Sequence, residues 1–184
     1  MKTKIIIFSA LLASISILIA GCATAPIARG ALQFTGYLEH QKIPLTCNVI
    51  IPEASRSYKS TSMGFNFELG PLFTENVPIA LRQVIKNISD SGNAPSDFII
   101  IAHLDNFSVT LSSIFPVVNS SITYELCTND KQSFKKINST QSYKSSFGSP
   151  RGTELYKMVF LMCLEDLNSQ LLEQKDFILS KTTK

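Results

Sequence analysis

The sequence has no tryptophan, only two histidines and four cysteines, and it lacks the short motifs of common enzyme classes. It contains no Gly-x-Ser-x-Gly turn, no glycine-rich phosphate loop, no His-Glu-x-x-His and no Cys-x-x-Cys. Charged residues make up only 17% of the chain, and the basic ones do not cluster as in proteins that bind nucleic acid. We therefore expect no enzymatic activity, no metal or cofactor site and no nucleic-acid partner.

The amino-terminal stretch, in contrast, has a clear pattern. Lys2 and Lys4 form a basic tip, residues 5–20 are uncharged and mostly apolar, and small residues follow. This is the layout of a secretory signal peptide, which is removed from the mature protein. The apolar run is also shorter than the roughly 20 residues that a membrane-spanning helix needs.

The end of this stretch, Ile19-Ala20-Gly21-Cys22, resembles the lipobox of bacterial lipoproteins. The resemblance implies cleavage before Cys22 and attachment of lipid to that cysteine. Ala23 then favours the outer membrane, because the inner-membrane retention signal of that family is usually an aspartate at this place. We expect a signal peptide at 1–21, a lipidated tether at 22–43 and a single globular domain at 44–180.

Length and charge agree with one domain in the cell envelope. The chain beyond residue 21 is long enough for one hydrophobic core and short for two. Lys2 and Lys4 account for two of the three net positive charges, so the mature chain is nearly neutral. Cys47, Cys127 and Cys163 allow at most one internal disulfide, with Cys47 and Cys127 the better pair; the alternative is three buried free thiols.

Alternation of apolar and polar residues predicts a series of strands. The expected strands are residues 45–51, 64–69, 97–111, 116–126 and 132–147, with 55–62 as a polar loop. Within 97–111 the apolar positions change from even to odd at Asp105-Asn106. This change predicts either a β-bulge or a tight turn. The polar strand 132–147 is typical of an exposed sheet edge.

Helical periodicity occurs twice. Apolar residues from Val77 to Ile88 form one helical stripe, and Pro78 places the expected start of this helix at Asn76 or Val77. A second helix is expected at 153–175. Between Leu155 and Leu164 its only charge is Lys157, so it is either packed between the sheet and the first helix or partly an interaction surface.

The expected fold class is therefore α+β, in the order ββαβββα, with a mostly antiparallel sheet of about five strands and two helices on one face. Residues 45–175 resemble small outer-membrane lipoproteins of the YajG-like, transporter-auxiliary and lipopolysaccharide-assembly kind. The likeness is carried by Pro52, Tyr58, Phe67-Glu68-Leu69-Gly70 and Asp97-Phe98-Ile99-Ile100. It implies a non-enzymatic accessory protein that faces the periplasm and binds a transporter or an outer-membrane complex.

Two other functions stay open. A lipid carrier would hold acyl chains between the sheet and the helices, favoured only by the apolar run 155–164. An envelope hydrolase would need His103, which can share a strand face with Asp105, to meet a nucleophile. No third ligand for a metal is visible near His103, and a metal site needs three or four.

Overall fold

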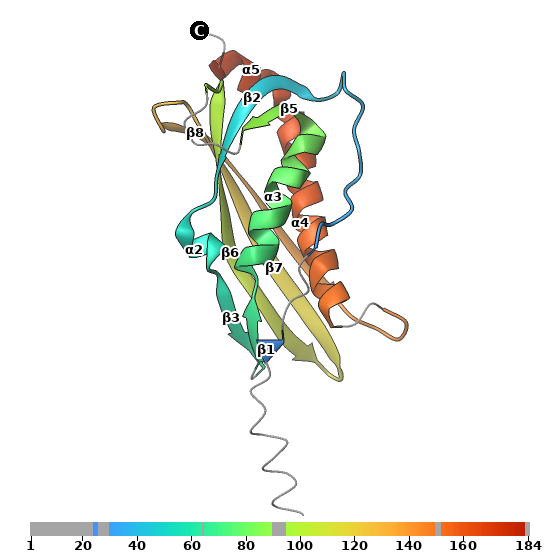
Figure 1. Cartoon of the computed structure of the whole chain (residues 1–184). Helices are drawn as coiled ribbons and strands as arrows, with labels where there is room; N and C mark the ends of the chain where they lie inside the picture. The colour runs from blue at the N-terminus through green and yellow to red at the C-terminus, as the bar shows by residue number, and fades with distance from the viewer. Residues whose placement is uncertain (1–23, 26–29, 64, 90–94, 150–151, 183–184) are drawn as a thin grey trace, which may run out of the picture.

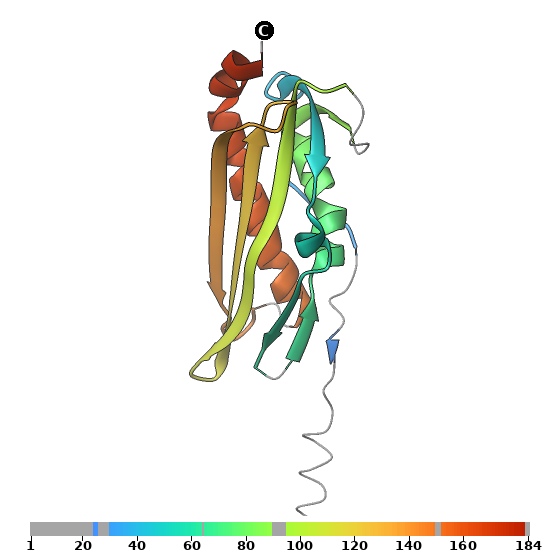
Figure 2. The same ribbon diagram turned by 90° about the vertical axis from the view of Figure 1, so that its left-hand side faces the viewer.

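A computed structural model describes residues 24–25, 30–63, 65–89, 95–149 and 152–182. The predicted signal peptide 1–21 and Cys22 lie outside the described residues. Two layers are visible, a five-stranded sheet and a pair of long helices that cover one of its faces (Figure 1; Figure 2). The general α+β class is as expected, but the described residues form four helices and not the expected two.

The strands and helices have the following bounds. The five-stranded sheet contains β5 (Ile85–Ser89), β2 (Ile43–Ile50), β6 (Phe98–Ser112), β7 (Phe115–Cys127) and β8 (Ser133–Lys144), in that order. A smaller sheet contains β1 (Thr24–Ala25), β4 (Phe65–Glu68) and β3 (Lys59–Ser62). The helices are α2 (Glu53–Arg56), α3 (Gly70–Val84), α4 (Thr153–Glu173) and α5 (Lys175–Thr182).

The larger sheet is mixed, and this corrects the expectation of a mostly antiparallel one. β2 runs parallel to both of its neighbours, β5 and β6, whereas β6, β7 and β8 are joined antiparallel. Parallel neighbours require a crossover connection. Here α3 belongs to the crossover connection from β2 to β5. The sequence analysis did not predict β5, and it therefore missed this parallel pairing.

The boundary between α3 and β5 explains that error. The sequence analysis placed Ile85 and Ile88 on the helical stripe, but the helix ends at Val84 and Ile85 has extended backbone angles (φ −116°, ψ 136°). The positions of Ile85 and Ile88 fit both the helical period and the strand period. In the structure, Ile85 is a fully buried strand residue opposite Ile43. The expected start was also wrong, because α3 begins at Gly70 and contains Pro78 inside it. The buried side chains of Leu72, Phe73 and Val77 stabilise the extra turns despite the backbone hydrogen bond that proline removes.

The segment 53–62 is more ordered than the predicted polar loop. It forms α2 and β3, and its hydroxyl groups contact the edge of β6 beyond the point where β2 stops pairing at Ile50 and Ile101. Ser55 accepts a hydrogen bond from Leu104 N–H and Tyr58 accepts one from Phe107 N–H, at 3.0 Å each. Ser60 donates to Phe107 O at 2.7 Å, and Ser62 accepts from Val109 N–H at 3.1 Å. These side chains take over the role of a neighbouring strand.

The change of parity in β6 is a bulge, and the alternative of a tight turn is excluded. The pairing of β6 with β7 shifts between Leu104 and Asn106, and both strands continue to the turn after Ser112. One extra residue, Asp105, keeps Leu104 and Phe107 on the same buried face. The predicted edge strand is confirmed as well, because β8 is the last strand of the sheet.

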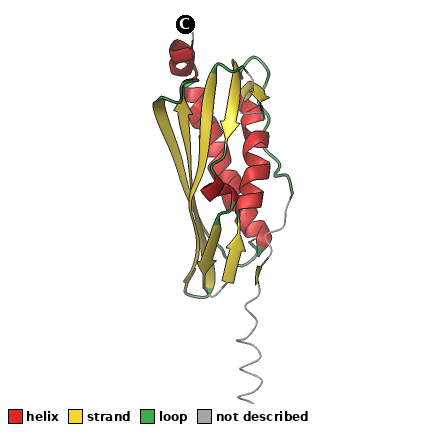
Figure 3. Ribbon diagram, turned by 60° about the vertical axis from the view of Figure 1, so that its left-hand side comes forward, coloured by secondary structure: helices red, strands yellow, loops and turns green. Residues whose placement is uncertain are grey.

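The core lies between the sheet and the helices (Figure 3). Aromatic rings from four elements meet there edge to face: Phe67 and Tyr156 at 5.2 Å between ring centres, Phe107 and Tyr156 at 5.8 Å, and Phe73 and Phe160 at 6.4 Å. Each such pair contributes about 0.5–1.5 kcal/mol beyond its buried area. This filled interior holds α3 and α4 on the sheet.

α4 packs on β7 and β8 and lies beside α3. The helix expected at 153–175 is therefore buried against the sheet, but next to the first long helix and not between it and the sheet. Asn168 of α4 is buried and donates a hydrogen bond to Ala80 O of α3 at 2.9 Å. In the described part of the chain, no helix is both long and apolar enough to cross a bilayer.

Candidate functional site

The predicted lipid attachment residue, Cys22, lies outside the described residues, but the chain two residues later is placed. Thr24 and Ala25 form β1 and pair in parallel with Asn66 and Phe67 of β4. β1 therefore lies at the end of the molecule opposite α5 (Figure 1).

Residues 30–42, here called the strap, fall within the segment that the sequence assigns to the tether. The strap lies along α3 and α4, and Leu32, Phe34 and Tyr37 pack against the core. Helix side chains hold its backbone: Glu75 accepts from Gly30 N–H at 3.2 Å, Lys175 of α5 donates to His40 O and Gln41 O, and Asn76 and Glu165 make two hydrogen bonds each with the strap. Asn76 accepts from Leu32 N–H at 2.6 Å and donates to Gly30 O at 3.3 Å. Glu165 accepts from Thr35 N–H at 3.1 Å and from the Thr35 hydroxyl at 2.9 Å.

A shallow groove follows the strap on its α4 side. It has a volume of about 340 Å³ and is lined by Ala31, Leu32, Gln33, Glu154, Lys157, Met158 and Leu161. Beside it, Met158, Leu161 and Met162 are only half-buried, at the spacing of one helical stripe. This outward stripe of α4 is a half-buried part of the apolar run 155–164, and its Met158 also packs against the core.

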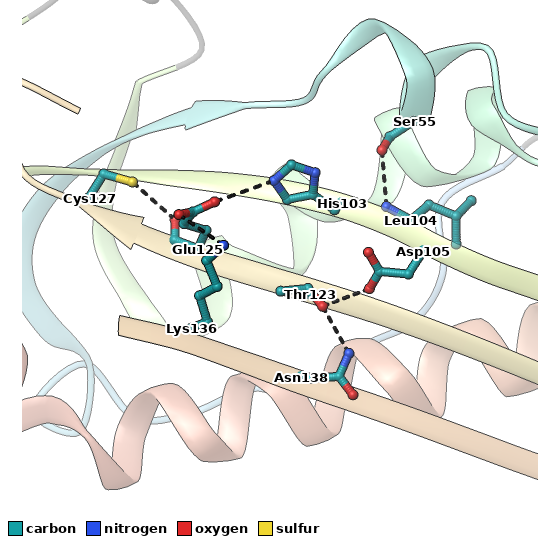
Figure 4. A network of polar contacts seen from close by, with 9 residues as sticks. All are labelled: Ser55, His103, Leu104, Asp105, Thr123, Glu125, Cys127, Lys136 and Asn138. Carbon is teal, nitrogen blue, oxygen red and sulfur yellow. Dashed lines mark hydrogen bonds and ion pairs between the residues drawn. The ribbon is translucent and has the colours of Figure 1, made fainter. Parts of the chain in front are cut away.

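The sheet face opposite the helices carries the polar network shown in Figure 4. Neighbouring strand residues point to opposite faces, so the odd-numbered residues of β7 lie on this open face. Glu125 lies between Lys136 Nζ at 3.2 Å and His103 Nε2 at 3.8 Å. Thr123 donates to Asp105 at 2.6 Å and accepts from Asn138 at 2.8 Å.

The electrostatics of this network are local. A hydrogen bond from Ser133 is the largest influence on Glu125, and together with Lys136 it lowers the pKa of that carboxyl below its ordinary value. The carboxylate is therefore ionised over the whole neutral range. It acts as the acceptor that joins β6, β7 and β8 on this face.

This geometry does not bring His103 and Asp105 together as a catalytic pair. The imidazole of His103 faces Glu125, and the carboxylate of Asp105 accepts a hydrogen bond from Thr123 (Figure 4). Thr123 is opposite His103 in the strand pairing, but its hydroxyl proton points to Asp105. The network fits cross-strand stabilisation. Among the described residues, no group of three His, Cys, Asp or Glu side chains could hold a metal ion.

The three body cysteines are free and buried. Of the two possibilities that the sequence left open, three buried thiols are therefore confirmed, and the bridge between Cys47 and Cys127 does not form. β6 lies between the strands that carry them, since Cys47 pairs with Phe98 and Cys127 with Ile99. Two strand spacings come to roughly 9–10 Å, beyond the distance that a disulfide bridges. Burial raises the pKa of all three thiols, which keeps them protonated.

The sequence analysis missed Glu125, Lys136, Thr123 and Asn138 as members of the network, and Asn76 and Glu165 as partners of the strap. A signal for the first group exists in the sequence. Asn119, Ser121, Thr123 and Glu125 occupy every second position of a strand whose other face is apolar. The sequence contains no such signal for Asn76, because an Asn among apolar helix residues is equally typical of an exposed position.

No protein-family model matches this chain, and no curated protein matches it. Some solved structures are weakly similar to this chain. One is a minor lipoprotein from Acinetobacter baumannii, with a TM-score of 0.37, 8% identity, and coverage of 74% of this chain and 94% of that chain. Another is the lipoprotein GNA1162 from Neisseria meningitidis, with a TM-score of 0.37, 8% identity, and coverage of 68% and 99%.

A third is PelC from Paraburkholderia phytofirmans, a dodecamer in its crystal, with a TM-score of 0.40, 11% identity, and coverage of 74% of this chain and 93% of that chain. These values describe a coarse likeness in the arrangement of strands and helices.

Proposed function

We propose that this chain is a lipid-anchored protein of the bacterial cell envelope, attached through Cys22 to the periplasmic side of the outer membrane. The observation that carries the proposal is the sequence of residues 1–22, in which a basic tip, an uncharged apolar run and Ile19-Ala20-Gly21-Cys22 occur in the required order. Each buried acyl methylene contributes about 0.8 kcal/mol, and stable anchoring needs more than one chain.

In this proposal the domain is a non-enzymatic accessory subunit that binds an envelope protein, either a transporter or an outer-membrane complex. Its contact surface is the outward stripe of α4. Met158, Leu161 and Met162 are half-buried there, and methionine side chains adapt to a partner's shape. α4, which carries the stripe, belongs to the helical layer (Figure 3). The opposite face of the sheet carries the polar network of Glu125, Thr123 and Asn138.

The anchor is tested by the mass of the amino-terminal peptide of the protein isolated from membranes. We expect a peptide that begins at Cys22 and carries acyl chains. The variant Cys22→Ser is expected to be released into the soluble fraction while its domain stays folded. A peptide that begins elsewhere, or an unmodified Cys22, would contradict the proposal.

The accessory role is tested by extraction in mild detergent with a carboxy-terminal tag, which lies at the end away from β1 (Figure 1). We expect an envelope protein in fixed stoichiometry with the wild type. Leu161→Glu is expected to lose this partner, whereas Thr140→Glu on the open sheet face is the matched control and should keep it. If both variants recover the envelope protein equally well, the outward stripe is not the contact surface.

One observation favours the alternative of a lipid carrier. The groove beside the strap is lined partly by Leu32, Met158 and Leu161, and its volume of about 340 Å³ suits part of an acyl chain. The space between sheet and helices, where the sequence would place such a ligand, is filled by the rings of Phe67, Phe107 and Phe160. A lipid that co-purifies in place of a protein would favour the carrier.

A further inference from the structure

The end of the molecule that contains β1 also carries most of the exposed large hydrophobic side chains. Three turns meet there: the β3–β4 turn, the β6–β7 turn and the loop between β8 and α4. Ser62 contacts Val109, and Phe115 meets Phe147 edge to face at 5.0 Å between ring centres. The exposed apolar residues of these turns are Met63, Phe65, Leu111, Ile114 and Phe147.

The exposure at this end is large. Ile114 is 76% exposed and Phe147 is 80% exposed, and both line a hollow that also includes Gly152. Scattered single apolar residues are normal on a protein surface, but a group of this kind marks an interaction site. The group therefore needs an apolar partner.

The charge at this end points to the same kind of partner. Residues 106–124, 60–67 and 145–150 contain no Asp, Glu, Lys or Arg. Lys144 and Arg151 flank the last of these segments. Contact of the three segments themselves with an apolar phase requires no charged group within them to leave water, which would be costly. The opposite end, in contrast, carries Lys175, Asp176 and Lys181 on or beside α5.

The course of the chain identifies the partner as a lipid bilayer. Thr24 pairs with Asn66, the residue next to Phe65, and Cys22 precedes Thr24 by two residues. Two residues span at most about 7 Å. A lipid on Cys22 therefore enters the bilayer within a short distance of these side chains. This step rests on the proposed function, because it needs Cys22 to carry acyl chains.

We propose that Met63, Phe65, Leu111, Ile114 and Phe147 form a membrane-contacting end that lies in the surface of the bilayer beside the lipidated Cys22. The anchored domain then stands with the axis of α4 directed away from the membrane. α5 and the turn at Leu38 face the periplasm.

The absence of tryptophan from the chain provides a direct test, since one introduced tryptophan is the only one present. The lipidated full-length mature protein is reconstituted in vesicles of phosphatidylethanolamine and phosphatidylglycerol, with or without bromine atoms on the acyl chains. Ile114→Trp and Phe147→Trp are the reporters. Leu38→Trp is the control, because Leu38 is 63% exposed and lies near the α5 end, where Lys175 contacts His40 O and Gln41 O.

α4 separates the two ends. Gly152, which precedes α4, lines the hollow with Ile114, and Lys175 follows the helix. A helix of 21 residues is roughly 30 Å long. The two reporters are therefore expected to lose most of their emission in brominated vesicles, and the control to keep it.

The outcomes separate this inference from the anchor itself. Acylated Cys22 with equal, weak quenching at residues 114, 147 and 38 would overturn the membrane-contacting end and leave the anchor intact. A blue shift at residue 114 without quenching would show that a second copy of the chain covers this end, which also overturns it. An unmodified Cys22 would contradict the proposed function and this inference together.

Discussion

At the scale of single residues, the buried polar groups of this domain divide into those with a partner and those without. Asn76 makes three hydrogen bonds, two of them to the strap. The hydroxyl group of Tyr124, fully buried on β7, has no hydrogen-bond partner among the described residues. An unpaired buried hydroxyl costs stability, whereas an apolar group of the same shape does not.

Tyr124→Phe is therefore expected to stabilise the domain. The phenyl ring keeps the packing, and removal of the hydroxyl group is expected to raise the free energy of unfolding by about 1 kcal/mol. Chemical denaturation measures this change. Tyr143→Phe is the control, since Tyr143 is half-buried and its hydroxyl lies 3.4 Å from Ser149 Oγ, and no gain is expected. A loss of stability in Tyr124→Phe would show that the hydroxyl group has a partner.

Glu125→Gln is expected to destabilise the domain at pH 7 and not at acidic pH. The folded-state pKa of Glu125 is lowered by Ser133 and Lys136. Its contribution is complete above the unfolded-state pKa of about 4.3 and is lost as the pH falls through the lower folded value. Denaturation at a series of pH values tests this, with exposed Glu173→Gln as control. A difference from wild type that is equally large at low pH would contradict it.

At the scale of elements, two junctions determine the path of the chain. One is the start of α3, where the backbone of Gly70 lies against α2. A Cβ atom on Gly70 would lie 1.8 Å from Arg56 O and 2.9 Å from Tyr58 N. The other is the strap, which Asn76 and Glu165 attach to the two long helices.

Gly70→Ala is expected to lower the free energy of unfolding by about 3 kcal/mol, because the clash is with backbone atoms that have no freedom to rotate away. Thermal or chemical unfolding measures the loss. Gly36→Ala is the matched control, since the nearest atom to its added Cβ is Gln83 Oε1 at 3.8 Å. Equal stability of the two variants would show that α2 can move aside at little cost.

Asn76→Leu is expected to release the strap. The variant leaves Leu32 N–H and Gly30 O without their side-chain partner, which costs about 2 kcal/mol. Hydrogen exchange should rise for residues 32–37 and stay unchanged in β6 and β7. Exposed Asn87→Ala is the control and should change neither quantity by much. If the strap stays protected from hydrogen exchange in Asn76→Leu, the apolar contacts of Phe34 and Tyr37 are what attach it.

The elements were predictable from the sequence where one period dominates. The strands β6 and β7, the helix α4 and the bulge at Asp105 all follow from alternation or helical spacing. Ile85 was misassigned because it fits both periods, and only its position opposite Ile43 decides between them. Residues 55–62 were predicted as a loop because their hydroxyl groups meet β6 at residues 47 to 49 positions away in the sequence. Such distant pairing leaves no local pattern.

At the scale of the whole molecule, the rate at which the three buried cysteines react with thiol reagents measures how often the domain unfolds. Cys47, Cys127 and Cys163 are buried in different elements, and only the thiolate form reacts with thiol reagents. In Cys22→Ser we expect slow labelling of all three at the rate of unfolding, and fast labelling in denaturant. Ser146→Cys, at an exposed position, is the control for immediate reaction. A native cysteine that reacts as fast as this control would show local opening of its strand or helix.

The hydroxyl groups that line β6 have a further consequence, which concerns aggregation. An uncovered strand edge is a template on which another chain can add a strand and start an aggregate. Here Ser55, Tyr58, Ser60 and Ser62 occupy that edge from within the same chain. The opposite edge, β8, carries Lys135, Lys136 and Lys144, whose charges disfavour stacking of identical strands. Both features disfavour the addition of a second copy of the chain to this sheet.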